Sequence, residues 1–138
     1  GSVRVPGCAA FWASPFELKG EFGGAAIPAG SAAGEDWGEA KINPGAGQNT
    51  TIACVATDAV LTPSQAQRIA VMAQAGLVRA IRPAHTPFDG DTVFVVSTGR
   101  KVLPEPAAYT LSRLGSLAAD TLARAIARGV YEAAGQAG

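Results

Sequence analysis

Two short apolar runs separated by a helix-like segment constrain the fold of this chain more than any other feature. Residues 50–57 are rich in β-branched side chains and have the length of a strand, and residues 91–97 form a second run with polar ends and an apolar middle. Turn-forming residues bound each run. Both runs are therefore predicted to be buried strands, and their apolar character predicts that both faces of the sheet are covered.

A helix is predicted between the two strands. Residues 62–65, Thr-Pro-Ser-Gln, combine an N-cap hydroxyl, a Pro at the first helical position and a Gln at the third, which is the pattern of a capping box. Apolar side chains then recur at spacings of three and four until Pro83. A second, longer helix is predicted from about residue 110 to 134, with Leu114 and Leu117 among its inward-facing residues. The order strand, helix, strand, helix predicts an α+β fold.

The first 49 residues differ in composition from the rest of the chain. They contain ten of the 17 Gly and five of the nine aromatic residues. A short strand is predicted at residues 3–5, an extended aromatic segment at 11–17 and a long irregular loop from 23 to 47. Because loops of that length inside compact domains are typically functional or disordered, the end of this loop is a candidate functional position.

Composition excludes several classes of protein. Eleven Lys and Arg balance eleven Asp and Glu, so the chain lacks the basic field that holds a nucleic acid, and no apolar run approaches the length that crosses a bilayer. A hydrophobic content of 48% disfavours disorder. Cys8 and Cys54 are too few for a disulfide scaffold and are expected as free thiols. Residues 1–7 show no targeting signal, and we expect a cytoplasmic protein.

The inventory of known catalytic motifs in the chain is short. It contains no Cys-x-x-Cys, His-Glu-x-x-His or Gly-x-Ser-x-Gly pattern, so we expect no metal centre, no cofactor and no Ser-His-Asp triad. His85 is the single histidine. The simpler interpretation of His85 is a loop histidine whose side chain is bonded to the backbone.

Two polar motifs stand where the predicted strands begin, Asn49-Thr50 before the first and Asp89-Gly90-Asp91 before the second. A Thr hydroxyl becomes an effective nucleophile when a base stands beside it, and a free α-amine on the same residue can be that base. Attack of the Thr50 hydroxyl on the Asn49 carbonyl, followed by hydrolysis of the resulting ester, would create that amine. Carboxylates at i and i+2 of an extended segment point to one face, so Asp89 and Asp91 are candidates for holding the hydroxyl and the ammonium.

Simpler interpretations of both motifs stay open at this point. Asn49-Thr50 also fits a strand that starts after an Asn turn, and Asp89-Gly90-Asp91 also fits a solvated turn or a calcium loop. Spacing alone does not decide between these structural roles and the catalytic one.

The residues around the two motifs resemble those of one enzyme family. Segments 49–58 and 79–94 are similar to the DmpA and nylon-oligomer hydrolase family, and segments 11–17 and 20–24 are similar to the part of that family that precedes its cleavage loop. The resemblance spans nearly the whole chain. It implies a precursor that cleaves itself before a Ser or Thr into α and β chains, which stay together in a four-layer αββα sandwich.

The same resemblance implies roles for individual residues. Carried onto this sequence, it makes Thr50 the nucleophile and new N-terminus, Asn49 the last residue of the α chain, and Asp89 with Asp91 the supporting acids. Members of the family that cleave β-peptides have Ser and Glu at the two acidic positions. The Asp-Gly-Asp of this chain is closer to the nylon-oligomer branch.

The resemblance also implies how the chain is divided. Residues 1–49 correspond to the C-terminal end of the α chain with the cleavage loop, and residues 50–138 correspond to the β chain, both within one structural domain. Family precursors are more than twice as long. We therefore expect a C-terminal portion whose fold is incomplete without an upstream α-chain segment, and we expect the donors of the oxyanion hole in that segment.

The sequence therefore predicts a self-cleaving N-terminal-threonine amide hydrolase that acts on small peptides, amino-acid amides or amide oligomers. The expected partners are a small amide or peptide substrate, the upstream α-chain segment and further copies of the protein in a homo-oligomer, with no nucleic acid and no membrane. Two alternatives remain: an acyltransferase of similar sandwich fold with a Thr nucleophile, and a non-catalytic remnant that only binds or assembles.

Overall fold

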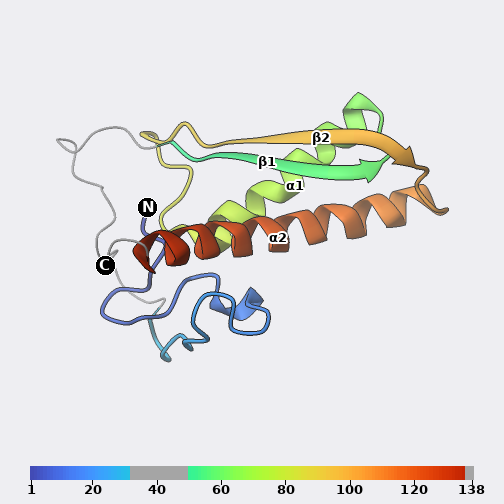
Figure 1. Cartoon of the computed structure of the whole chain (residues 1–138). Helices are drawn as coiled ribbons and strands as arrows, with labels where there is room; N and C mark the ends of the chain where they lie inside the picture. The colour runs from blue at the N-terminus through green and yellow to red at the C-terminus, as the bar shows by residue number, and fades with distance from the viewer. Residues whose placement is uncertain (32–49, 136–138) are drawn as a thin grey trace.

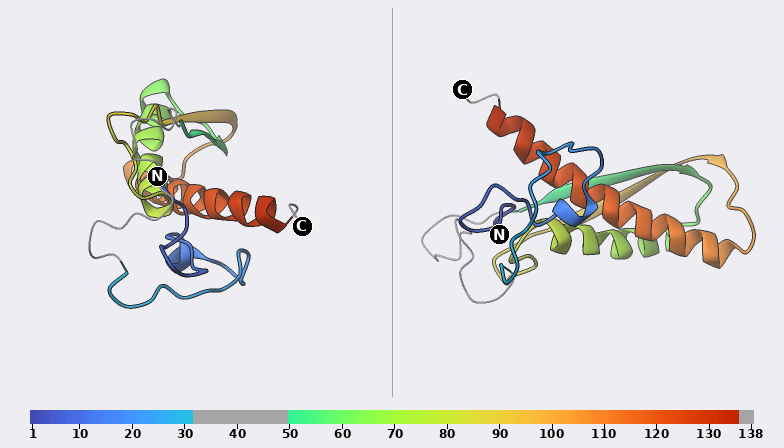
Figure 2. Two further views of the ribbon diagram at one scale, coloured as in Figure 1. Left: turned by 90° about the vertical axis from the view of Figure 1, so that its left-hand side faces the viewer. Right: turned by 90° about the horizontal axis from the view of Figure 1, so that it is seen from below.

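The computed structural model describes residues 1–31 and 50–135, which form a two-stranded sheet, a layer of two helices and an irregular N-terminal segment (Figure 1). The helices lie on one face of the sheet, and the N-terminal segment lies on the far side of the second helix (Figures 1 and 2). This arrangement confirms the predicted α+β class. The elements are the 3-10 helix η1 (Ser14–Phe16), strand β1 (Ile52–Ala59), helix α1 (Pro63–Ala80), strand β2 (Thr92–Lys101) and helix α2 (Ala107–Gly135).

The two strands pair in parallel, with Ile52 opposite Thr92. Parallel neighbours require a crossover connection, which α1 provides. Both strands therefore begin at the same edge of the sheet. Thr50, which precedes β1, and the Asp89-Gly90-Asp91 turn, which precedes β2, therefore lie near one another at this edge.

Burial alternates along both strands, so that one face of the sheet is packed and the other is open. Ala53 and Val93 are buried against the helices. The prediction that both faces are covered is wrong for the described residues, because only one of the two layers that could sandwich the sheet lies within them. The apolar side chains on the open face include Ile52, Cys54, Phe94 and Val96.

Helix α1 begins as its sequence predicts. The Gln65 backbone N–H donates to Thr62 Oγ1 at 3.3 Å, and the Thr62 backbone N–H donates to Gln65 Oε1 at 2.8 Å, which completes the capping box. Ile69 and Leu77 are buried on its inner face. Because apolar residues spaced three and four apart lie on one side of a helix, this face packs against the sheet and α2.

Helices α1 and α2 approach each other closely where both carry small residues. A Cβ added to Gly76 would overlap the carbonyl oxygen of Ala119, and one added to Gly115 would overlap the side chain of Met72. The inward face of α2 is narrower than predicted, because Leu117 is 58% exposed. No helix in residues 1–31 and 50–135 is long and apolar enough to cross a membrane.

The N-terminal segment is fixed to α2 by aromatic and ionic contacts. Phe11 and Phe22 are buried with their ring centroids 5.5 Å apart in an edge-on arrangement. Arg124 donates two hydrogen bonds to the Glu21 carboxylate. Residues on both sides of position 49 therefore contribute to one hydrophobic core.

Single backbone bridges replace the strand predicted at residues 3–5. Arg4 pairs with Phe11, and Ser2 pairs with Arg82, each as an isolated antiparallel bridge. The prediction of a strand here is wrong because these pairings are not extended by their neighbours. The second bridge ties the N-terminal segment to the connection that leads from α1 to β2. Cys8 and Cys54 are free, and Cys54 is exposed on the open face of the sheet.

Candidate active site

The parallel register brings Thr50 and the Asp-Gly-Asp turn together at the leading edge of the sheet. The Thr92 backbone N–H donates to the Thr51 carbonyl oxygen at 2.9 Å, so the pairing of the strands already starts at Thr51. Thr50 is exposed at this edge. The neighbouring Asp89-Gly90-Asp91 turn limits where its side chain can lie.

Gly90 is the part of the turn that lies closest to Thr50. A Cβ added to Gly90 would lie 2.9 Å from Thr50 Oγ1 and 3.5 Å from Thr50 Cγ2. Only a residue without a side chain fits this approach without a shift of the neighbouring atoms. A side chain at position 90 would therefore displace the hydroxyl of Thr50 from the place it occupies here.

Asp91 holds the peptide that follows Thr50. Its Oδ1 accepts a hydrogen bond from the Thr51 backbone N–H at 2.9 Å, and its side chain is only 5% exposed. A hydrogen bond from an amide to a carboxylate contributes about 1.5–3 kcal/mol. Asp91 Oδ2 faces His85, whose backbone N–H donates to it at 3.4 Å and whose Nδ1 lies 3.6 Å away.

Asp89 closes the turn through hydrogen bonds with Thr86. Its Oδ2 accepts hydrogen bonds from the Thr86 backbone N–H at 2.8 Å and from Thr86 Oγ1 at 2.9 Å. Burial raises the pKa of Asp89, but the hydrogen bonds from Thr86 and smaller charge interactions together lower it by more, so that the pKa lies below the usual value of an aspartate. Asp89 is therefore a carboxylate at neutral pH.

The structure brings Thr50, Asp89 and Asp91 to one corner of the molecule, and it shows how the two acids are engaged. Asp91 is bonded to the strand that Thr50 enters, whereas Asp89 orders the turn that carries Gly90. Asn49 lies outside the described residues. The catalytic roles of these residues stay predictions.

Sequence reasoning missed Thr86. Its N–H and hydroxyl both bind a carboxylate three residues later, which is a local side-chain motif typical of Ser and Thr in turns. The spacing Thr-Pro-x-Asp over residues 86–89 was the available signal. No local sequence pattern indicates the approach of Gly90 to Thr50, because this contact depends on the pairing of two strands that are distant in sequence.

A calcium loop at the turn finds no support in the described ranges. Residues 1–31 and 50–135 contain no group of three or more His, Cys, Asp or Glu side chains able to hold a metal ion. Both carboxylate oxygens of Asp91 and Oδ2 of Asp89 accept hydrogen bonds from donors of the protein instead.

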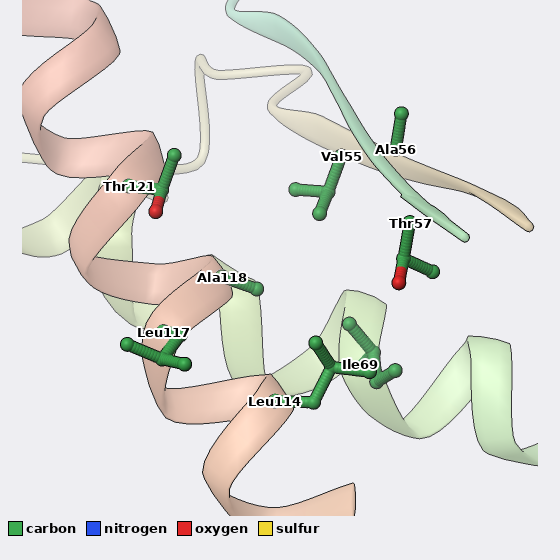
Figure 3. Close-up of a pocket in the computed structure, with 8 residues that line it drawn as sticks. All are labelled: Val55, Ala56, Thr57, Ile69, Leu114, Leu117, Ala118 and Thr121. Carbon is green, nitrogen blue, oxygen red and sulfur yellow. The ribbon is translucent and has the colours of Figure 1, made fainter. Parts of the chain in front are cut away.

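A separate hollow of about 140 Å³ opens between β1 and the two helices (Figure 3). Val55 and Thr57 point into it from the strand, and Leu117 is part of its far wall. At about 3.3 Å per strand residue, Val55 lies roughly 16 Å from Thr50. The hollow is therefore not part of the candidate site. Its lining residues are Val55, Ala56, Thr57, Ile69, Leu114, Leu117, Ala118 and Thr121.

Comparison with known proteins gives relatives that share this region. The chain is 46% identical over 99 residues to an uncharacterized aminopeptidase of Mycobacterium tuberculosis, which covers 65% of this chain and 29% of the relative. An uncharacterized aminopeptidase of Mycobacterium leprae is also 46% identical, over 65% of this chain and 27% of its own length. The chain thus spans less than a third of these relatives.

A second group of relatives is named for a different activity. The chain is 32% identical over 90 residues to a 6-aminohexanoate-oligomer endohydrolase of Agromyces, covering 65% of this chain and 25% of that enzyme. The family described as peptidase family S58 matches residues 15–138. Because this match takes in most of the chain, the protein belongs to peptidase family S58, the DmpA and nylon-oligomer hydrolase family of hydrolases.

Proposed function

We propose that this chain carries the nucleophile of a self-cleaving amide hydrolase, and that the nucleophile is Thr50. The substrate class is a small peptide, an amino-acid amide or an amide oligomer. The observation that carries the proposal is the hydrogen bond from the Thr51 backbone N–H to Asp91, together with the approach of Gly90 to the Thr50 hydroxyl. These two contacts support the proposal because they join Thr50 and the following peptide to the Asp89-Gly90-Asp91 turn at the strand entrance.

The first chemical step is cleavage of the bond between Asn49 and Thr50. Thr50 Oγ attacks the Asn49 carbonyl carbon, the peptide C–N bond breaks as the amine takes up a proton, and an ester replaces the amide. Water then hydrolyses the ester. The products are a carboxylate on Asn49 and a free α-amine on Thr50, so the nucleophile and its base come to occupy the same residue.

Hydrolysis of a substrate amide follows the same pattern. The α-amine of Thr50 accepts the hydroxyl proton as Oγ attacks the substrate carbonyl, and it returns the proton to the leaving amine. Water then hydrolyses the acyl ester and regenerates Thr50. Asp91 keeps the following peptide in place, and the carboxylates of Asp89 and Asp91 provide negative charge that stabilises the ammonium formed during the reaction.

We further propose that an upstream segment covers the open face of the sheet and supplies the oxyanion donors. The support is the exposed apolar surface of that face, where Ile52 is 72% exposed and Phe94 57%, and the greater length of the relatives. The complete assembly is then a four-layer αββα sandwich. A homo-oligomer in the cytoplasm is the proposed form of the whole protein.

The test uses the natural protein that carries this sequence. Intact mass is expected to show two chains, the second beginning at Thr50, and Thr50→Ala is expected to abolish both the cleavage and the hydrolysis of amide substrates. Thr50→Ser is the matched control, because it keeps the hydroxyl and the α-amine and is expected to be cleaved and active. An uncleaved wild-type protein with full amidase activity would contradict the proposal.

A further inference from the structure

The side chain of His85 lies at the candidate site but has no part in the reaction described above. Its Nδ1 lies 3.6 Å from Asp91 Oδ2, within the range of an ion pair when the ring is protonated. The His85 side chain is 39% exposed, whereas that of Asp91 is 5% exposed. The imidazole is therefore the solvent-accessible member of this pair, and the carboxylate is the buried one.

The backbone of His85 adopts a conformation that most residues avoid. Its φ angle is +57°, in the left-handed region where glycine is free of strain and where Asn, Asp and His are the tolerated side chains. A side chain kept in this region next to a reactive site indicates that the side chain has a use there. The contact with Asp91 is a use that the structure shows.

The two oxygens of the Asp91 carboxylate have different partners. Oδ1 accepts from the Thr51 backbone N–H, whereas Oδ2 faces the backbone N–H and ring of His85. Rotation of a carboxylate about its last torsion is soft. Without the ring, Oδ2 would keep only the long hydrogen bond from the His85 backbone N–H at 3.4 Å, so the carboxylate would turn more freely and the tether on Thr51 would loosen.

We propose that His85 is a positioning residue that holds Asp91 and, through the Thr51 peptide, fixes the place of Thr50. This inference rests on the proposed function of Thr50. His85 touches neither Thr50 nor the reacting atoms in this role. Its effect reaches the nucleophile through one carboxylate and one hydrogen bond, so it should change the rate of the chemical steps more than substrate binding.

An isosteric pair of variants tests the proposal in the natural protein. His85→Asn and His85→Asp both tolerate a positive φ and differ in size very little. The Asn side chain can place a donor near Asp91, whereas the Asp side chain places a second carboxylate there. We expect His85→Asn to retain kcat and the self-cleavage rate within about threefold, and His85→Asp to lose about tenfold to hundredfold in both, with KM changed less than about twofold. Equal rates for the two variants would overturn the proposal.

A glycine variant separates the side chain from the backbone. His85→Gly keeps the conformation and the backbone N–H but removes the ring, and Lys19→Gly is its matched control because Lys19 also has a φ of +57° and lies in the N-terminal segment. Both are expected to keep the thermal midpoint of the wild type, and only His85→Gly is expected to lose about tenfold or more in kcat. A wild-type kcat in His85→Gly would overturn the proposal.

The same measurements keep the two proposals apart. If Thr50→Ala stays uncut and inactive while the His85 series matches the wild type, only the role of His85 fails. If Thr50→Ala is cut and active, the proposed function fails, and the role of His85 fails with it. If His85→Gly has a lower thermal midpoint than Lys19→Gly, the role of His85 is judged from the kcat of His85→Asn against that of His85→Asp.

Discussion

At the scale of single residues, a glycine allows Thr50 to lie close to the Asp89-Gly90-Asp91 turn. Gly90 lies between two acids whose carboxylates both accept hydrogen bonds, and its Cα faces the hydroxyl of Thr50. The missing side chain leaves the space in which that hydroxyl lies. Substitution at this position therefore tests the geometry without removing any reacting group.

We expect Gly90→Ala to lower kcat/KM by about tenfold to hundredfold, because the new Cβ would lie 2.9 Å from Thr50 Oγ1 and push the hydroxyl away. Stability should change by less than about 1 kcal/mol, since Thr50 is exposed and free to move aside. Steady-state kinetics and thermal unfolding of the natural protein measure the two effects. Gly135→Ala, at a position with open space around it, is the control, and a Gly90→Ala enzyme with the wild-type kcat/KM would contradict this account.

Local sequence patterns predicted which residues belong to the candidate site, whereas the hydrogen-bond partners of those residues depend on three-dimensional contacts. Thr50, Asp89 and Asp91 were identified because they stand at strand entrances, which the sequence marks by its β-branched runs. The division of work between the two acids depends on the turn that Thr86 and Asp89 close. Side-chain partners of this kind follow from three-dimensional geometry and have only weak sequence patterns.

At the scale of elements, boundaries followed the sequence where caps and periodicity were strong. Helix α1 starts at its capping box, and β1 and β2 begin within two residues of the predicted positions. The strand expected at residues 3–5 failed because three apolar or basic residues specify no partner. Leu117 fits an inward stripe by spacing, yet it is exposed because the partner helix covers a narrower face.

The contact between the helices gives a prediction with a built-in control. Gly76→Ala is expected to destabilise the protein by about 1–3 kcal/mol, because its Cβ would overlap the backbone of Ala119 and force the helices apart. Gly129→Ala, where nothing lies within 4 Å, is expected to stabilise α2 by about 0.5–1 kcal/mol. Denaturant unfolding of the natural protein measures both. Changes of the same sign would show that α1 and α2 do not approach as described.

At the scale of the whole molecule, the open face of the sheet is an exposed apolar surface within the described residues. Its exposed side chains include large apolar ones that soluble proteins normally bury, and they stand in a row along two strands. The apolar character of the two runs predicted that both faces are covered, but it does not indicate which part of a protein covers each face. The proposed upstream segment would complete the sheet's burial.

Two residues of nearly equal exposure test whether the upstream segment covers the sheet. Phe94 on the sheet is 57% exposed and Val71 on α1 is 56% exposed in this chain. If the upstream segment covers the sheet, Phe94→Glu should destabilise the natural protein by about 3 kcal/mol or more by burying a charge, whereas Val71→Glu should stay within about 0.5 kcal/mol. Thermal unfolding of both variants checks this, and equal effects would argue against a covered sheet.

The parallel arrangement has an electrostatic consequence for the edge at which Thr50 lies. Helices α1 and α2 both run opposite to the strands (Figure 1), so the ends of the two helices that carry partial negative charge face the direction of the strand entrances. This field adds to the carboxylates of Asp89 and Asp91. If the proposed cleavage frees an amine on Thr50, this field would favour the protonated form of that amine, and catalysis by the amine would then improve as the solution becomes more alkaline.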